Sequence, residues 1–401
     1  MTKLYLYDDA KARTFEPYAL TRPLGELRAG TALIRHRWED AFGVRAAGAV
    51  VAPHLADFEE LDAPPAVAAV VPAGAVLANS RCVVPTLWHD READVWTCGR
   101  RVAAVRLGSD LPLAELADGD TPLESLGAGG TRLVDIPGRW LDEVWSLITE
   151  LPSQLADDIV RLGPRLERGG VGGGTVIGDH PVVVEQGATI EPMVVLDATA
   201  GPILVRRGAT VRAFTRLVGP CAVAGGVTIV GGRVAGCSIG ETSVISGEMS
   251  ETVVLGHANK AHEGFVGHSY LGRWVNLGAG TTTSNLKNTY GTVGLWTPSG
   301  TRDTGAVKLG TFFGDHVKTG IGLRLTTGSV IGAGSNVYGA SMPPKYVPPF
   351  SWGDGGALGG YDAARFVATA RRAMSRRGVP LGERGERQLL AALARARGGA
   401  A

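Results

Sequence analysis

The chain has few of the residues that build covalent cross-links, and no segment suited to crossing a membrane. Of 401 residues only four are cysteines, and Cys82, Cys98, Cys221 and Cys237 show no CxxC spacing. We therefore expect free thiols in a reducing compartment. No run reaches the ~18 apolar residues of a membrane span, and the start, MTKLYLYDDAK, lacks the apolar core of a signal peptide. These absences predict a cytoplasmic protein.

The chain also lacks an excess of charge of either sign. Its 40 lysines and arginines stand against 39 acidic residues, a formal net charge of +1. We therefore expect neither nucleic acid nor an anionic membrane as a partner. Glycine is abundant instead, at 58 residues, beside 44% hydrophobic residues. That hydrophobic content argues against disorder, and the glycines suit β-structure with many tight turns.

From about residue 171 an aliphatic residue recurs every six positions, and small residues follow many of them, as in IGETS, LGAGTT and IGAGSN. The pattern is the hexapeptide repeat of a left-handed parallel β-helix, in which roughly 18 residues form one triangular coil. The positions expected to point inward are Val184, Ile190, Leu196, Val205, Val211, Leu217, Val223, Ile239, Ile245, Phe265, Leu271, Leu277, Phe313, Thr319, Leu325, Ile331 and Val337. A polar segment at 286–306 interrupts the repeat and predicts a functional loop.

The N-terminal part follows a different pattern. Short apolar runs such as KLYLY, GAVVAP and GAVLANS predict buried strands, and 24–42 between the first two predicts a helix. Alternating strands and helices indicate an α/β domain with a largely parallel sheet. We predict this domain with linker helices over 1–166, the β-helix over 167–350, and over 351–401 a tail with two basic amphipathic helices.

His262 and His268 occupy the same place in consecutive hexapeptides, in the stretch HEGFVGHSYLGRWVNLGAGTTTSN. Consecutive hexapeptides lie on different faces of a triangular coil, so the two side chains are expected to point in different directions. At most one of them then belongs to a given site within one subunit.

The segment NKAHEGFVGHSYLGRWVNLGAGTTTSN resembles the β-helix of bifunctional UDP-N-acetylglucosamine pyrophosphorylase/glucosamine-1-phosphate N-acetyltransferases, without gaps from Glu248 to Asn285. LTRPLGELRAGTALIRHRW near the start and PPKYVPPFSWG near the end are similar to a divergent bacterial branch of that family. The resemblance implies an enzyme that acetylates an aminosugar phosphate from acetyl-CoA and transfers a nucleotidyl group from an NTP to a sugar 1-phosphate. Because family sites lie between subunits, it also implies a homotrimer.

The resemblance places His262 at the family's general base and Asn276 and Asn285 at its substrate-orienting asparagines. An imidazole suits the first role because it accepts protons near neutral pH. Phe265 replaces a tyrosine that contacts phosphate. Ser250 and Gly291 stand where the family has lysines, and Lys260 and Lys287 are the candidates to supply the missing charge. His268 is expected to be a coil-surface residue or a contact between subunits.

The resemblance also indicates where acetyl-CoA would bind. Gly320, Ile321 and Ala333 fall in the regions that line the acyl donor in the family. Lys318, Arg324 and Lys345 are candidate contacts for the CoA phosphates.

The N-terminal domain lacks the glycine-rich loop that usually cradles nucleotide phosphates in this family, and LTRPLGELRAG takes its place. Arg22 and Arg28 are the candidates to neutralise those phosphates. Asn79 and Arg81 occupy the place of the family's metal-binding aspartate. If Mg²⁺ is used, Asp8 and Asp9 after the first strand are the alternative acids.

Two alternatives stay open. One is a zinc enzyme of the carbonic-anhydrase type, suggested by the spacing of His257 and His262, although a third histidine is missing. The other is a non-catalytic protein that binds nucleotide sugars or serves as a scaffold, suggested by the missing lysines and glycine-rich loop.

Overall fold

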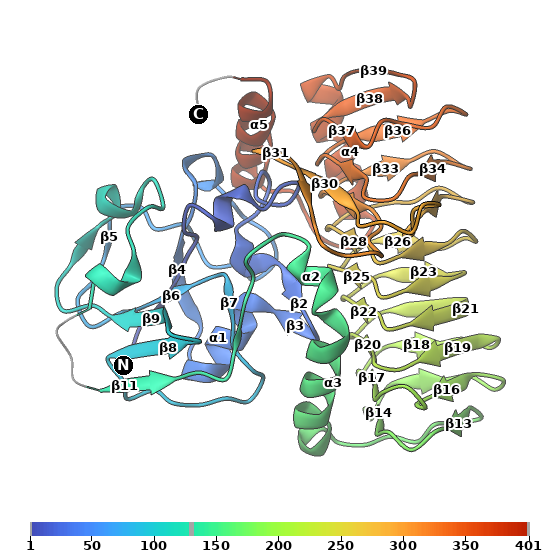
Figure 1. The fold of residues 1–401 in the computed structure, drawn as a ribbon, viewed down its shortest axis with the longest axis horizontal. Helices are drawn as coiled ribbons and strands as arrows, with labels where there is room; N and C mark the ends of the chain where they lie inside the picture. The colour runs from blue at the N-terminus through green and yellow to red at the C-terminus, as the bar shows by residue number, and fades with distance from the viewer. Residues whose placement is uncertain (1, 128–131, 399–401) are drawn as a thin grey trace. The chain divides into compact units, whose positions relative to one another are not determined.

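The computed structural model describes residues 2–127 and 132–398, and the chain folds as two compact units (Figure 1). The first unit comprises Met1–Val144 and Val379–Ala401, and the second comprises Trp145–Gly378. The division therefore falls ahead of the predicted boundary at residue 166, because helix α3 (Leu151–Leu162) packs on the first coils of the β-helix. The predicted C-terminal tail is shared between the two units.

The first unit contains a six-stranded sheet with the order β11-β8-β9-β6-β1-β4. Its strands are β1 (Leu4–Tyr7), β4 (Ala46–Val50), β6 (Val76–Asn79), β8 (Val95–Cys98), β9 (Arg101–Arg106) and β11 (Leu133–Asp135). Strand β1 runs parallel to β4 and β6, as predicted, but β9 is antiparallel to both β6 and β8. The sheet is mixed because Gly99 and Arg100, both with positive φ, close β8 and β9 into a tight hairpin.

The helix predicted over 24–42 is shorter than expected. Only α1 (Ile34–Phe42) is α-helical, and it ends at Gly43 in the left-handed conformation. Ahead of it, Gly30 at φ 58° turns a small hairpin that breaks the helical pattern. The shorter elements are η1 (Ala12–Thr14), η2 (Leu24–Glu26), β2 (Arg28–Ala29), β3 (Ala32–Leu33), η3 (Pro53–Leu55), β5 (Val70–Val71), β7 (Cys82–Val83), β10 (Leu111–Pro112), η4 (Leu113–Leu116), η5 (Leu123–Ser125) and β12 (Arg139–Trp140).

The two C-terminal helices form as predicted, as α4 (Ala363–Ser375) and α5 (Glu383–Ala396). Helix α5 packs on the first unit, where the Gln388 side chain donates to the Thr21 carbonyl at 3.2 Å. Helix α4 belongs to the second unit.

The second unit is the predicted parallel β-helix, whose coils stack one above the other from β13 to β38 (Figure 1). The first face consists of β13 (Thr175–Ile177), β16 (Val195–Asp197), β19 (Thr215–Val218), the end of β21 (Thr228–Ala235), β24 (Met249–Ser250), β27 (Val266–Gly267), β29 (Thr282–Thr283) and β34 (Arg324–Leu325). The second face consists of β14 (Val182–Val184), β17 (Ile203–Val205), β20 (Cys221–Val223), β22 (Ser238–Ile239), β25 (Val253–Val254), β28 (Tyr270–Leu271), β32 (Phe312–Phe313), β35 (Val330–Ile331) and β37 (Tyr346–Val347). The third face consists of β15 (Thr189–Ile190), β18 (Thr210–Val211), the start of β21, β23 (Val244–Ser246), β26 (Asn259–Lys260), β33 (Lys318–Thr319), β36 (Asn336–Tyr338) and β38 (Ser351–Asp354), which pairs with β39 (Ala357–Gly360).

The aliphatic positions predicted from the repeat fill the interior of the coil, with one exception. Val266, and not Phe265, is the inward residue of its strand, because it pairs in register with Met249 of the coil before. That coil is one residue shorter than the ideal repeat, so the phase slips by one. The Phe265 ring is therefore half-buried outside the core.

Corners of successive coils repeat the same backbone conformation, often with a non-glycine residue at positive φ. Glu251 and His268 adopt it between the first and second faces, and His257, Trp274 and His316 between the second and third. Neighbouring strands lie about 4.8 Å apart, so such corners place side chains from one coil directly above those of the next. Each corner thus carries a column of side chains drawn from residues far apart in sequence.

The polar segment at 286–306 leaves the coil as the antiparallel hairpin of β30 (Gly294–Thr297) and β31 (Gly300–Asp303). Trp296 holds it against the β-helix by stacking on Tyr346, with ring centroids 3.6 Å apart. The remaining helices are α2 (Ser146–Thr149) and η6 (Gly163–Arg165). In the described part of the chain, no helix has the length and apolar character needed to cross a bilayer.

Candidate functional site

The first unit has a cavity of about 280 Å³ where the parallel strands β1 and β6 end. The carboxyl ends of parallel strands are the usual place for ligands in α/β sheets. The side chains that line the cavity are Tyr7, Asp9, Lys11, Asn79, Arg81, Arg101, Val102, Asp120, Thr121, Pro122, Leu123, Glu124 and Trp140, with Ala10 and Gly119. Of the residues predicted here, Asn79 and Arg81 therefore lie at the cavity.

Arg81 organises this cavity. Its guanidinium binds both carboxylate oxygens of Asp9, with Nη2 2.6 Å from Oδ2 and Nε 2.9 Å from Oδ1. Asn79 donates to the same carboxylate at 2.8 Å. Burial by itself would raise the pKa of Asp9, but the hydrogen bond and charge of Arg81 hold that pKa below its usual value. Arg101 adds a second guanidinium beside Arg81, because it lies 3.9 Å over the Trp140 ring and 2.6 Å from Asp142, which Arg81 also contacts at 3.3 Å.

Arg22 and Arg28 lie in the interior of the first unit and do not line the cavity. Both are 2% exposed. Arg22 is paired with Glu60 at 2.9 Å, and Arg28 donates to the Thr31 carbonyl at 2.6 Å. These two arginines of the loop that replaces the glycine-rich one are thus bonded to other groups of the first unit.

The carboxylates of the first unit do not form a metal site. Asp9 is ion-paired with Arg81, and Asp8 is buried, accepts from the Leu24 amide at 2.9 Å, and has its pKa raised to about 6 by burial. Among the described residues, no three histidine, cysteine or acidic side chains come together as metal ligands would. The donor set therefore does not fit a Mg²⁺ held by the protein itself.

On the β-helix, three polar side chains form a column between the first and second faces. Glu251 Oε2 lies 3.3 Å from His268 Nε2, and His268 Nδ1 lies 2.8 Å from Asn285 Nδ2. The imidazole is 7% exposed, and its hydrogen bond lowers the pKa of Glu251. His268 is thus a buried partner of a predicted site residue, in contrast to the expected coil-surface residue.

Phe265 completes this cluster because Gly267 leaves room for it. A Cβ on Gly267 would overlap the Phe265 ring and lie 2.7 Å from the Asn285 amide nitrogen. The aromatic ring and the amide therefore lie side by side over the first face. The cluster of Glu251, Phe265, His268 and Asn285 is called the amide cluster below.

His262 and Lys260 precede the amide cluster on the corner from the third face to the first. His262 is exposed, and no hydrogen bond of its ring is found in the part of the chain that the structure describes. Lys260 is buried and donates to the carbonyls of Ser246 at 2.6 Å and His262 at 2.9 Å. Burial lowers the pKa of Lys260 to about 8. Lys260 therefore anchors the His262 backbone, and its ammonium points into the coil.

The other predicted residues of the second unit are spread over several faces. Asn276 bonds to Asn259 at 2.8 Å on the third face, away from the corner of Asn285. Lys287 donates to the Thr292 carbonyl at 2.9 Å within the polar segment. Gly320 and Ile321 share one corner, with Ile321 79% exposed, whereas Ala333 is buried at another and Lys345 is exposed ahead of β37. All these assignments stay predictions.

The histidine spacing that suggested zinc does not bring the two side chains to one place. Strand β26 separates His257 from His262, which lie at opposite ends of it. The His257 ring packs on Trp274, with centroids 4.6 Å apart, and its Nδ1 lies 3.1 Å from a guanidinium nitrogen of Arg273. A ring nitrogen that faces a guanidinium is poorly placed to bind a cation.

Sequence reasoning missed Glu251, and also Lys308, whose charge helps to lower the pKa of Glu251. The signal that indicates Glu251 is its spacing in the sequence. Glu251 lies 17 residues before His268, and His268 lies 17 residues before Asn285. This spacing is one full coil, whereas the six-residue period only relates one face to the next.

Residues 4–164 match the family model described as sugar nucleotidyl transferase. Over 91 residues the chain is 35% identical to the bifunctional sugar-1-phosphate nucleotidylyltransferase/acetyltransferase of Sulfurisphaera tokodaii, and the match spans 23% of each chain. The chain thus covers about a quarter of that relative's length. The first unit is therefore a sugar-nucleotidyltransferase-like domain, joined to the β-helix that the hexapeptide repeats predict.

Two solved structures are similar to the β-helix. The Arabidopsis UDP-N-acetylglucosamine acyltransferase is 12% identical, covers 50% of this chain and 75% of its own, and gives a TM-score of 0.23. The Bacillus cereus N-acyltransferase AntD, in complex with dTDP and 3-hydroxybutyryl-CoA, is 14% identical, covers 51% and 92%, and gives a TM-score of 0.19. At these TM-scores the likeness says nothing about substrate or mechanism.

Proposed function

We propose that the protein is a bifunctional transferase of nucleotide-sugar metabolism. The first unit transfers a nucleotidyl group from an NTP to a sugar 1-phosphate, and the β-helix transfers an acetyl group from acetyl-CoA to the amine of an aminosugar phosphate. The observation that carries the proposal is the match of residues 4–164 to sugar nucleotidyl transferases in a chain that continues into a hexapeptide β-helix.

In the acyl transfer, His262 is the general base. It takes a proton from the sugar amine as the nitrogen attacks the thioester carbonyl; the new C–N bond forms, the C–S bond breaks, and the CoA thiolate leaves and takes up a proton. The exposed ring supports this role because both nitrogens are accessible. The amide cluster contributes Asn285 from the other end of the first face, where its Nδ2 donates to His268 and its Oδ1 is left to accept a hydrogen bond from the substrate.

In the nucleotidyl transfer, Arg81, Arg101 and Lys11 supply positive charge at the cavity for the phosphates. Trp140 supplies a flat apolar surface beside them. Asp9 keeps Arg81 in place through two hydrogen bonds.

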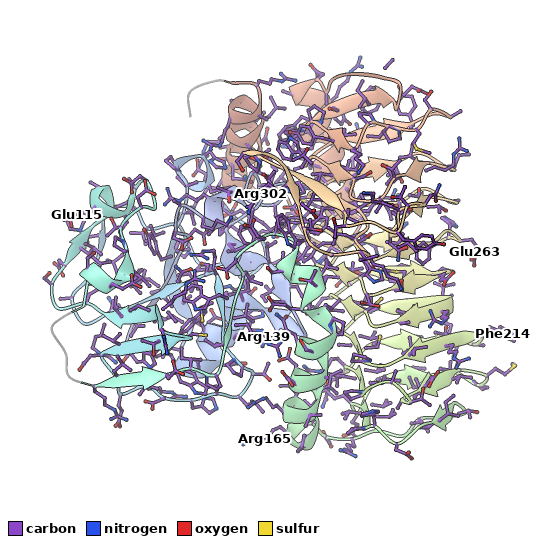
Figure 2. All side chains as sticks on the ribbon, viewed as in Figure 1. Glu115, Arg139, Arg165, Phe214, Glu263 and Arg302 are labelled. Carbon is purple, nitrogen blue, oxygen red and sulfur yellow. The ribbon has the colours of Figure 1, made fainter. Side chains whose placement is uncertain are left out.

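We also infer a homotrimer. The strands of each face pair within the stack of coils, so association must use side chains on the faces and corners. Met193, Phe214 and Ile321, on the corner from the third face to the first, are 62%, 74% and 79% exposed. Phe214 and Glu263 project from this same edge (Figure 2). Large apolar side chains along one corner are suited to contact with a second copy.

Two assays on the purified full-length chain test the two activities separately. Release of pyrophosphate is measured with each NTP and a panel of sugar 1-phosphates, and release of free thiol with acetyl-CoA and a panel of aminosugar phosphates. Turnover in each assay is the expected result. Absence of turnover in one assay removes that activity only.

The non-catalytic alternative has one observation in its favour for the first unit. Asp9 at the cavity is paired with Arg81, and the described side chains offer no group of three ligands for a metal there. Binding of an NTP or nucleotide sugar by calorimetry, without pyrophosphate release under any condition, would favour this alternative.

A further inference from the structure

A second cavity, of about 480 Å³, lies within the second unit between the third face of the β-helix and helix α4. Strand and corner residues of the β-helix form one wall of the cavity, and one face of helix α4 forms the other. The lining residues are Val244, His257, Asn259, Trp274, Val275, Asn276, Lys318, Thr369, Arg372, Ala373, Arg376 and Arg377. This cavity is called the arginine pocket. Its volume lies in the range of small-molecule sites.

The charges of the arginine pocket all have one sign. Lys318, Arg372, Arg376 and Arg377 line it, and no carboxylate is found among its described lining residues. The cavity of the first unit differs, because Asp9, Asp120 and Glu124 balance its cations. Four cations around one concavity repel one another, and concave sites focus their combined field.

Local contacts hold two of these four cations, Lys318 and Arg377, in position. Lys318 Nζ donates to the carbonyl oxygens of Trp274 at 2.6 Å and His316 at 3.2 Å. Arg377 Nη2 lies 3.5 Å from Asn259 Oδ1, and Asn259 in turn donates to Asn276. Burial and then the neighbouring Arg376 lower the pKa of Arg377, which reflects the cost of gathering positive charge here.

The gathering of four cations in one pocket is explained most simply by a site that binds an anion. Arginine and lysine together recognise phosphate, arginine by paired hydrogen bonds and lysine as a point charge. The indole of Trp274 and the imidazole of His257 give the pocket an aromatic wall as well. We propose that the arginine pocket binds a small phosphorylated ligand through its phosphate groups.

The pocket is separate from the amide cluster, which lies on another corner of the coil. Asn276, the predicted substrate-orienting asparagine, lines the pocket as well, and CoA and UDP are also ligands of the proposed transfer reactions. The proposal is therefore tested by the loss of binding in variants of the pocket rather than by turnover. The source of the phosphate groups is either a free polyphosphate anion or a nucleotide-type molecule such as CoA or UDP. Direct binding distinguishes these sources.

Isothermal titration of the full-length chain with inorganic pyrophosphate at pH 6.5 and low ionic strength tests the proposal. Wild type is expected to bind, and Arg372→Gln/Arg376→Gln to bind at least tenfold more weakly. The matched control is Arg365→Gln, an exposed arginine of the same helix that does not line the pocket. Parallel titrations with CoA, UDP and inorganic phosphate identify the source as the probe whose affinity falls most in the double variant relative to wild type.

Both arginines are exposed, so the double variant is expected to fold with an unchanged Tm. Ala373→Glu, which places a carboxylate on the pocket wall, is a second variant expected to weaken binding. Failure of wild type to bind any of the four probes, equal affinity in the double variant, or an equal loss in Arg365→Gln would each overturn the proposal.

Discussion

Glu251 and His268, one full coil apart, are joined by a contact of 3.3 Å between Oε2 and Nε2. The other ring nitrogen of His268 lies 2.8 Å from the amide nitrogen of Asn285. An amide nitrogen can only donate, so Nδ1 accepts and Nε2 carries the proton that faces Glu251. Both ring nitrogens are occupied, so we expect His268 to position Asn285, and His262 stays the proposed base.

Replacing His268 with alanine is expected to release Asn285 and raise the KM for the aminosugar phosphate. A lost buried hydrogen bond corresponds to about 1–3 kcal/mol. The KM for acetyl-CoA is expected to stay nearly constant, which a general loss of structure would not reproduce. Glu251→Gln, which keeps the size of the side chain, should show the same pattern in weaker form. Equal changes in both KM values would show that the amide cluster has only a structural role.

His262→Ala is expected to lower kcat for acyl transfer by ~10²–10⁴-fold, the usual contribution of a general base. Because the side chain is exposed, Tm should not change. His180→Ala is the matched control, since His180 is another exposed histidine of the β-helix outside the amide cluster. Unchanged acyl transfer in His262→Ala, with every active substrate, would remove this base.

The sequence allowed the β-helix to be predicted almost completely, because its repeat is a direct consequence of coil geometry. The one error in phase, at Phe265, arose where a coil is a residue short, and no local pattern marks that slip. In the N-terminal domain the hairpin of β8 and β9 turned a predicted parallel sheet into a mixed one. The hairpin turns at Gly99 and Arg100, which both have positive φ. Only Gly99 is a residue that usually indicates such a turn in a sequence.

The candidate sites were harder to predict, since their side chains meet across coils. Glu251, His268 and Asn285 come together only when residues 17 apart are compared. The arginine pocket could not be foreseen, because the basic residues of α4 belong to an ordinary amphipathic pattern until the helix is placed on the third face. Asn79 and Arg81 were located by their place after a strand, and the Asp9 carboxylate that holds them follows the neighbouring parallel strand.

Arg81→Gln is expected to weaken NTP binding and to destabilise the first unit. A hydrogen bond to a charged group corresponds to about 1.5–3 kcal/mol. The folded-state pKa of Asp9 is depressed, so this stabilisation is present above the unfolded-state pKa and is lost as pH falls and Asp9 protonates. The Tm difference from wild type should therefore be large at pH 7 and shrink in acid. Arg132→Gln, at an exposed pair with Glu92, is the control and should change neither property.

Phe214→Glu is expected to dissociate the proposed homotrimer. The ring is 74% exposed on the corner of the β-helix, so the change should not disturb the fold of one subunit, whereas a carboxylate buried between copies is strongly unfavourable. Light scattering coupled to size exclusion would give the mass of a trimer for wild type and of a monomer for the variant. A wild-type mass of one chain would contradict the trimer outright. Tyr290→Glu, a comparably exposed aromatic residue of the polar segment, is the comparison variant.

The pH dependence of the arginine pocket follows from Lys318, whose pKa is lowered to about 7 by burial. An anion prefers the charged lysine, so affinity should be high below this pKa and should fall as pH rises through it. The other charged or titratable groups at the pocket are His257 and three arginines, and the arginines stay charged throughout. Sulfate is the suitable probe because its charge is constant between pH 6 and 9.

Sulfate affinity is measured by isothermal titration at several pH values between 6 and 9. Lys318→Gln should bind sulfate weakly and with little dependence on pH, whereas His257→Gln should retain the wild-type profile. If His257→Gln flattened the curve and Lys318→Gln did not, the histidine would be the group that titrates. A wild-type affinity independent of pH would show that the arginines alone hold the anion.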